Sequence, residues 1–288
     1  MLPAFLIEIV FYLVPGFETV RERFEWMGRK SLRAVLLCAS ALLPYMVLGW
    51  AAGSFSHGLA LAAAILVASF WYVGIEPSLP ADLLFLGFMA AVYLSKLFDQ
   101  SYGHLNAHVA LGILGKLMWI RLGLMEVLSL RGMKGVKFGF VPSAREWRIG
   151  ALFYAGFLPV GGAVAYLLRL GSFHPQPLVW WKFAGLAAAT FFGMLWVVAL
   201  AEEFFFRAFL QAVLARKLRS ATAGLIIASV LFGLAHLPYR VFPNWRYVAI
   251  ATMLGLFCGM AMQKAGSVRA SMVTHALVVV TWRMLFVG

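Results

Sequence analysis

The chain has 288 residues, of which 63% are hydrophobic and only 12% are charged. Soluble globular domains have about 45–50% apolar and about 25% charged residues, so this composition excludes a soluble globular domain and predicts a polytopic membrane protein. The net charge is +13, but Lys and Arg gather in short clusters between apolar runs, at Arg21–Arg33, Arg131–Arg148 and Arg216–Arg219. This pattern is typical of cytoplasmic loops and does not indicate a nucleic-acid partner.

The apolar runs predict an all-α bundle of transmembrane helices, because one span needs about 20 mostly apolar residues. The N-terminal stretch, which ends at Pro15–Gly16 and contains Glu8, is predicted to be an interfacial helix and not a signal peptide. Nine candidate spans follow, near Leu32–Gly53, Gly58–Ile75, Ala81–Phe98, Ala107–Leu130, Ile149–Leu170, Leu178–Leu200, Ala221–Leu237, Tyr247–Met262 and Ala270–Phe286. The fourth contains Lys116, Arg121 and Glu126, which either face the bundle interior or mark an interfacial helix. We therefore expect eight or nine spans.

The polar interval Arg131–Arg148 divides the chain. We expect an N-terminal membrane-helical region, residues 1–148, and a C-terminal domain, residues 149–288, whose motifs lie within 199–279. The basic clusters predict a cytoplasmic start and place the loops 170–178 and 238–245 outside, where Arg240 and Arg246 depart from the positive-inside rule. The expected location is a multi-pass integral membrane protein, in the plasma (inner) membrane if the source is bacterial.

Three charges interrupt the apolar stretch ALAEEFFFRAFL, residues 199–210. A charge at mid-bilayer costs about 2.5–3.5 kcal/mol, so these groups need partners or a polar cavity. Glu203 and Arg207 are spaced i, i+4, which predicts an ion pair on one helix face. Glu202 lies about 100° round the helix and is left free. The alternative is that these charges mark the cytoplasmic end of a span, although the sequence continues apolar for two further turns.

Two histidines lie in later apolar segments. His236 ends a helix one turn after Phe232, and antiparallel helices would bring it to the depth of Glu202. A histidine at a helix end is also typical of an interfacial or structural position. His275 lies inside the final span and needs a polar partner, for which the glutamate pair is nearest. Since it follows Arg269 by only six residues, it is expected to lie less deep than His236.

The other candidate ligands form no recognisable site. Gly255–Gly259 has a GxxxG spacing, which predicts close helix packing. Cys38 and Cys258 have neither redox nor metal-ligand spacing. The remaining histidines are interpreted as solvated loop residues: His57, His104, His108 and His174. No HExxH occurs, so a zincin motif is absent.

Together, the motifs Glu202–Glu203–x–x–x–Arg207, Phe232–x–x–x–His236 and His275–x–x–x–Val279 resemble those of the CAAX-protease and bacteriocin-processing (CPBP) family, which includes the type II CAAX prenyl endopeptidase. The resemblance covers roughly residues 178–288. The family pattern is EExxxR, FxxxH and HxxxN or HxxxD, so Val279 departs from it. In the family, the side-chain amide of the Asn in HxxxN is thought to help stabilise the oxyanion.

The resemblance implies an intramembrane endopeptidase that hydrolyses a peptide bond in a membrane-proximal or lipid-modified substrate. Glu202 would activate the water, and His236 and His275 would position it or donate to the oxyanion. Glu203, Arg207 and Phe232 would support these groups. No cofactor is favoured; zinc held by Glu202, His236 and His275 is the second mechanism. The implied partners are the lipid bilayer and a membrane-associated peptide or protein.

Two other functions stay open. A non-catalytic relative, such as a bacteriocin-immunity or sorting partner, is favoured by Val279. An ion- or proton-coupled transporter would use the same buried ionisable residues as a relay.

Overall fold

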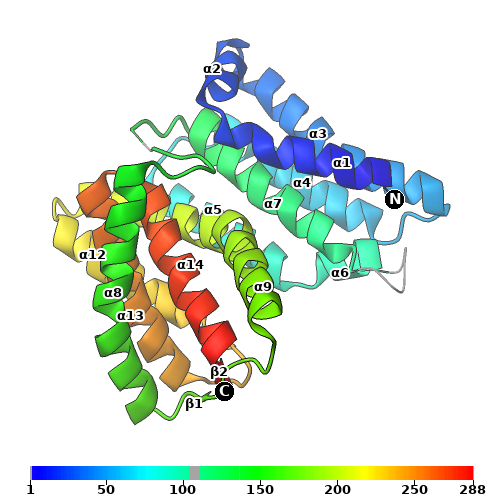
Figure 1. Cartoon of the computed structure of the whole chain (residues 1–288). Helices are drawn as coiled ribbons and strands as arrows, with labels where there is room; N and C mark the ends of the chain where they lie inside the picture. The colour runs from blue at the N-terminus through cyan, green and yellow to red at the C-terminus, as the bar shows by residue number, and fades with distance from the viewer. Residues whose placement is uncertain (1, 104–109, 136, 288) are drawn as a thin grey trace. The chain divides into compact units, whose positions relative to one another are not determined.

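The computed structural model describes residues 2–103, 110–135 and 137–287. The chain forms two compact units, Met1–Gly135 and Val136–Gly288 (Figure 1). The division predicted between residues 148 and 149 falls inside a helix of the second unit, Ala144–Leu167. The domain assignment stays a prediction.

The first unit is built from helices. They are α1 (Leu2–Leu13), a 3₁₀ turn (Val14–Gly16), α2 (Glu18–Trp26), α3 (Lys30–Ala52), α4 (Gly58–Gly74), α5 (Leu79–Leu94), α6 (Leu97–Tyr102), α7 (Gly112–Met125) and a π-helical segment (Glu126–Leu130). The chain bends by 89° between Leu2–Gly16 and Glu18–Trp26. Helix α1 packs against α3 and α7. The interfacial placement expected for the N-terminal helix stays a prediction.

Buried ion pairs hold the first unit together. Arg121 and Glu8, 113 positions apart in the chain, form an ion pair of 3.2 Å with both side chains buried. Arg131 and Asp82 pair at 2.6 Å. Glu126 is fully buried and accepts a hydrogen bond from the backbone N–H of Tyr72. Of the two placements open for the charges of the fourth predicted span, Arg121 and Glu126 therefore take the bundle interior.

The second unit contains α8 (Ala144–Leu167), β1 (Ser172–Phe173), α9 (Trp180–Gly193), α10 (Leu200–Glu203), α11 (Ala212–Lys217), α12 (Ala221–Ala235), α13 (Trp245–Ala265), α14 (Val268–Leu285) and β2 (Phe286–Val287). Two π-helical segments, Met194–Ala199 and Phe204–Gln211, join α9, α10 and α11 into one helix of 38 residues, Trp180–Lys217. The short strands β1 and β2 pair antiparallel near the C-terminus (Figure 1).

Helix ends in the second unit follow from local capping. Ser143 and Glu146 form a reciprocal capping box at the start of α8. Ser220 caps α12 and Asn244 caps α13 through their side-chain oxygens. Helix α13 ends at Gly266, whose φ of 67° lies in the left-handed region that glycine adopts without strain. Local sequence thus fixes where these helices begin and end.

Helices α12 and α13 approach closely because glycines line their contact. A Cβ atom built on Gly255 would lie 3.1 Å from Ser229, and one built on Gly233 would lie 2.7 Å from the carbonyl oxygen of Val248. A Cβ on Gly259 would lie 2.6 Å from Oε1 of Gln211. The packing role predicted for the Gly255–Gly259 spacing is confirmed.

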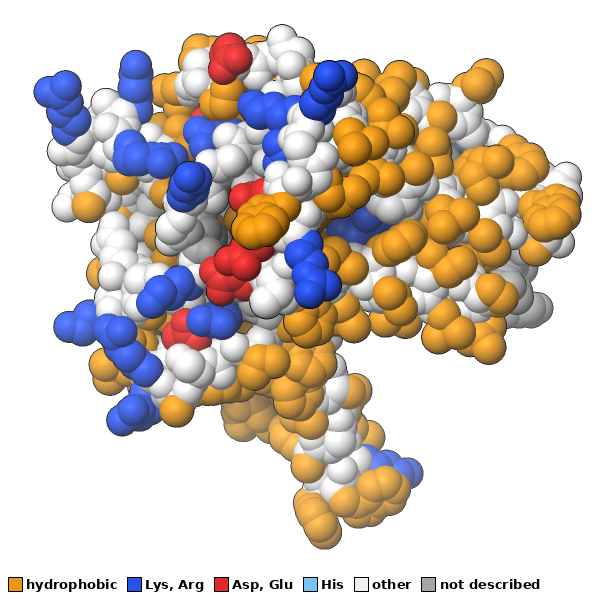
Figure 2. Space-filling model, turned by 90° about the horizontal axis from the view of Figure 1, so that it is seen from above, with side chains coloured by type: hydrophobic (Ala, Val, Ile, Leu, Met, Phe, Trp, Pro, Cys, Tyr) orange, Lys and Arg blue, Asp and Glu red, His pale blue; other side chains and the backbone are white. Residues whose placement is uncertain are grey.

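The surface of the chain is apolar, as the composition requires. Among exposed side chains, Leu59 retains 90% and Trp180 retains 82% of its accessible surface, and hydrophobic side chains cover much of the face in Figure 2. Within the described residues, four helices are long and apolar enough to span a membrane: Lys30–Ala52, Ala144–Leu167, Trp180–Lys217 and Trp245–Ala265. The bent N-terminal pair would make a fifth, and α4, α5 and α12 are shorter apolar helices.

The predicted all-α membrane bundle is therefore confirmed, and the chain is an integral membrane protein. Eight or nine crossings stay a prediction, as does the orientation.

Candidate functional site

The 38-residue helix changes its winding on both sides of the two adjacent glutamates. Glu202 and Glu203 lie in α10, a single α-helical turn between the two π-helical segments. π-Helical turns inside longer helices occur frequently at functional sites. The interpretation that these charges mark the end of a span is not needed, because the helix continues to Lys217.

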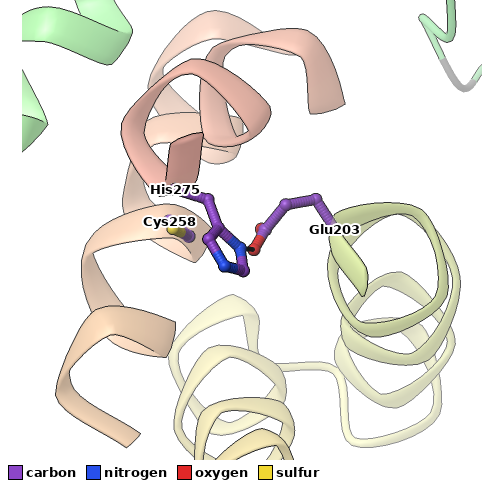
Figure 3. Close-up of side chains that lie close together, drawn as sticks. All are labelled: Glu203, Cys258 and His275. Carbon is purple, nitrogen blue, oxygen red and sulfur yellow. Dashed lines mark hydrogen bonds and ion pairs between the residues drawn. The ribbon is translucent and has the colours of Figure 1, made fainter. Parts of the chain in front are cut away.

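Glu203 is fully engaged by two partners. Its side chain is completely buried; Oε2 lies 3.2 Å from Nε of Arg207, and Oε1 lies 2.7 Å from Nδ1 of His275 (Figure 3). The predicted i, i+4 pair is confirmed, and so is the expectation that the glutamates supply the polar partner of His275. One carboxylate thereby links α10 to α14.

Arg207 is also completely buried. Its guanidinium carbon lies 4.3 Å from the centre of the Phe232 ring, so an aromatic face of α12 covers the cation. Its nitrogens have no hydrogen-bond acceptor with good geometry in the part of the chain that the structure describes. The guanidinium is therefore held by charge and packing, and it neutralises Glu203.

Glu202 has a different environment from its neighbour. Its side chain is 30% exposed, and Oε2 lies 3.8 Å from Nε2 of His275. This oxygen is itself buried and lacks a hydrogen-bond partner among the described residues. A buried acceptor without a partner calls for an explanation, such as a water molecule or ligand. The difference between the two glutamates is therefore that Glu203 is completely buried between Arg207 and His275, whereas Glu202 is partly exposed.

The two imidazoles are held in the same tautomer. A carbonyl oxygen can only accept, so Nδ1 of His236 donates to the backbone carbonyl of Phe232 at 2.8 Å. Nδ1 of His275 likewise donates to the Glu203 carboxylate at 2.7 Å. In each ring the bond fixes the tautomer and leaves Nε2 as the second, functional nitrogen.

Phe232 connects the two histidines. Its ring centre lies 4.7 Å from that of His236 and 5.9 Å from that of His275. The structure thus brings Glu202 into direct contact range of His275, whereas His236 reaches the cluster through Phe232. The smaller depth expected for His275 does not keep it from Glu202.

Two residues of the cluster were missed by sequence reasoning. The sulfur of Cys258, on α13, lies within 4.8 Å of ligand atoms of Glu203 and His275 (Figure 3). Tyr247 packs on the ring of His236, with centres 5.9 Å apart. Cys258 lies one turn after Gly255, so the GxxxG spacing was the available signal that this face of α13 approaches the site.

The structure allows a test of the metal hypothesis. The cluster Glu203, Cys258 and His275 does not fit a cation, because both Glu203 oxygens and Nδ1 of His275 are engaged and Arg207 adds a positive charge beside them. The three residues predicted to bind zinc are of types that bind it. Glu202 and His275 offer two ligand atoms 3.8 Å apart, and Nε2 of His236 is available because its hydrogen bond is made by Nδ1.

The oxyanion donor expected from the family pattern has no asparagine substitute in the described residues. Asn244 is occupied, since its side chain accepts from the Tyr247 N–H and donates to the carbonyl of Tyr239. Asn106 and the histidines His104 and His108 lie outside the described residues. His57 bonds to Ser56, and His174 is exposed, away from the contacts of the cluster.

Residues 183–281 match the family model described as Type II CAAX prenyl endopeptidase Rce1-like. This segment is similar to that family. The match contains all three motifs and runs from α9 to α14, so the predicted resemblance to the CAAX-protease family is confirmed over this segment. Among curated proteins and solved structures, no match is found. The matched segment contains Glu202, His236 and His275.

Proposed function

We propose that the chain is an intramembrane endopeptidase that hydrolyses a peptide bond in a membrane-proximal or lipid-modified substrate, with Glu202 as general base. The observation that carries the proposal is the unequal use of the two glutamates. Glu203 is completely buried, pairs with Arg207 at 3.2 Å and bonds to His275 at 2.7 Å, whereas Glu202 is 30% exposed and has His275 as its ionic neighbour only at 3.8 Å.

The proposed reaction begins with a water molecule between Glu202 and His275. Two hydrogen bonds of about 2.8 Å can reach from one water to both atoms, because Oε2 and Nε2 are 3.8 Å apart. Glu202 takes one proton of this water while the oxygen attacks the carbonyl carbon of the substrate. The proton then passes from Glu202 to the leaving amine, so that acid and amine products balance the water consumed.

Charge develops on the carbonyl oxygen during the attack. The Glu203 carboxylate lies at Nδ1 of His275, on the side of the ring away from Nε2. Its negative charge favours a second proton on the ring, at Nε2, which can be donated to the oxyanion or to the water. Nε2 of His236 is an acceptor in the neutral ring, because Nδ1 holds the proton, so it can bind the water and donates only when the ring is protonated. Val279 supplies no donor, and loss of one oxyanion donor lowers a rate by about 10²–10³.

Zinc bound by Glu202, His236 and His275 would supply a Lewis acid and an acidified water. In that case the same three residues would act as ligands, while Glu203 would hold the ring of His275 in place. Because these three residue types can bind zinc, an experiment with a chelator separates the zinc mechanism from the glutamate mechanism.

The proposal is tested with Glu202→Gln in full-length protein reconstituted in lipid vesicles, with an internally quenched lipidated peptide as the probe. Cleavage should fall by about 10²–10⁴, while the variant stays folded. Wild-type cleavage rates in Glu202→Gln would refute glutamate-activated hydrolysis. Proton-coupled solute uptake without cleavage would instead support the transporter.

A further inference from the structure

A pocket of about 420 Å³ opens at the end of the second unit where α8 and α14 end and α13 begins. Three arginines line it: Arg169 after α8, Arg240 in the loop before α13, and Arg246 in the first turn of α13. Aromatic side chains complete the wall, among them Trp245 and Trp282. This end lies beside β1 and β2 in Figure 1.

Among the described residues of this unit, no carboxylate side chain pairs with the arginines of the pocket. Residues 136–288 contain only three acidic residues against 14 Lys and Arg, counted from the sequence. Glu146 pairs with Arg269, Glu203 pairs with Arg207, and Glu202 lies at His275. The acidic side chains of this unit therefore leave the arginines of the pocket available to a bound anion.

The start of α13 adds to the attraction for anions. Its first turn contributes residues 245–247 to the pocket wall, and the N-terminus of a helix carries partial positive charge and free N–H groups. The Asn244 side chain satisfies the N–H of Tyr247. The first turn thus strengthens a field that the three arginines already create.

The rim of the pocket is apolar, which favours a lipid over a soluble anion. Val241, Phe242 and Trp245 keep 62%, 71% and 60% of their accessible surface. Aromatic side chains beside arginines are typical of the level of lipid headgroups. An amphiphile would place its phosphate against the arginines and its acyl chains along these exposed side chains.

The location also explains the one departure from the positive-inside rule. Arg145, Lys264 and Arg269 meet at the opposite end of the helices, where Arg145 bonds to the carbonyl of Lys264 and Arg269 pairs with Glu146. Helix α8 is 24 residues long, or about 36 Å, which is long enough to place the two basic ends on opposite sides of a bilayer. Arginines at the second end work against insertion unless they have a separate role.

We propose that Arg169, Arg240 and Arg246 bind the phosphate of an anionic phospholipid. Tyr247 lines this pocket and also packs on His236. A lipid bound in this pocket would therefore lie next to the candidate active site. The binding itself does not depend on proteolysis.

The test measures retention of phosphatidylglycerol by the full-length protein in phosphatidylcholine nanodiscs, with native mass spectrometry as the readout. Replacing the three arginines by Gln should weaken binding by roughly 100-fold, since each Arg near an anionic lipid contributes about a factor of five. The matched control replaces Arg216, Lys217 and Arg219 by Gln, which removes the same charge at the other end. This control should retain the lipid as the wild type does.

Each other outcome overturns the proposal. Equal losses in both triple variants would mean unspecific attraction, and unchanged retention in the pocket variant would mean that the lipid binds elsewhere. Displacement of the lipid by inorganic phosphate at equal concentration would identify a soluble anion as the ligand. If the pocket triple variant does not fold, Arg246→Gln alone should weaken binding about fivefold, and an unchanged affinity in that variant refutes the assignment.

Discussion

The same Glu→Gln substitution should lower mainly the stability at Glu203 and mainly the activity at Glu202. Glu203→Gln keeps the shape of the side chain but removes the charge that lies 3.2 Å from Arg207 and 2.7 Å from His275. Arg207 is completely buried, and removal of one partner of a buried ion pair costs about 3–5 kcal/mol in the free energy of unfolding. For a unit of this size the melting temperature should fall by on the order of 10 °C.

Glu202→Gln should leave the stability nearly unchanged. The side chain is 30% exposed and its ionic neighbour, His275, lies at 3.8 Å, so the loss in unfolding free energy should stay below about 1 kcal/mol. Cleavage should nevertheless fall by about 10²–10⁴, because the general base is gone. One substitution thus removes activity at constant stability, whereas the other removes stability first.

The assay combines thermal unfolding in detergent with cleavage of a quenched lipidated peptide in vesicles. The double variant Glu203→Gln with Arg207→Met serves as the control, because removing both charges of a buried pair is often neutral or stabilising. It should unfold at a higher temperature than Glu203→Gln alone. The reasoning is refuted if Glu203→Gln melts with the wild type, or if Glu202→Gln melts as early as Glu203→Gln.

Further substitutions test the same geometry. Val279→Asn restores the amide of the family pattern and should raise kcat, by at most the factor of about 10²–10³ that an oxyanion donor is worth; an unchanged or lower kcat would show that position 279 does not face the oxyanion. Gly233→Ala places a Cβ 2.7 Å from the carbonyl oxygen of Val248 and should lower the melting temperature, whereas Gly185→Ala, which meets open space, should raise stability by about 1 kcal/mol. Equal melting of these two variants would contradict the close α12–α13 contact. Chelators should leave cleavage unchanged if Glu202 acts without metal; loss of activity that zinc restores would establish the metal mechanism.

Local spacing made the central ion pair predictable. Glu203 and Arg207 are four residues apart on one helix, so their contact depends only on helical geometry. The bond between Glu203 and His275 spans 72 positions, yet it could be inferred because a buried imidazole needs a partner and this half of the chain has few acids. Scarcity of polar groups in a membrane protein limits the choices.

Other contacts could not be predicted, because neither helical spacing nor a small number of possible partners identified them. The partner of Arg121 is Glu8, far away in the sequence, and several acids of the first unit were equally available from the sequence. The span predicted at Leu178–Leu200 is part of a longer helix, Trp180–Lys217, because hydropathy measures apolar runs and not the continuity of a helix. Its π-helical segments have no sequence signature of their own.

The pair of glutamates also explains why a free carboxylate can exist in this apolar unit. Glu203 and Arg207 neutralise each other, so the charge of Glu202 must be balanced by the remaining group, His275. Glu203 accepts from Nδ1 of that histidine, which leaves Nε2 as the nitrogen that lies 3.8 Å from Glu202. The fully buried glutamate thus acts through His275, and its partly exposed neighbour retains a polar partner. Removal of Glu203 should consequently disturb the orientation of His275 even in the Arg207→Met background. The double variant should regain stability but not cleavage.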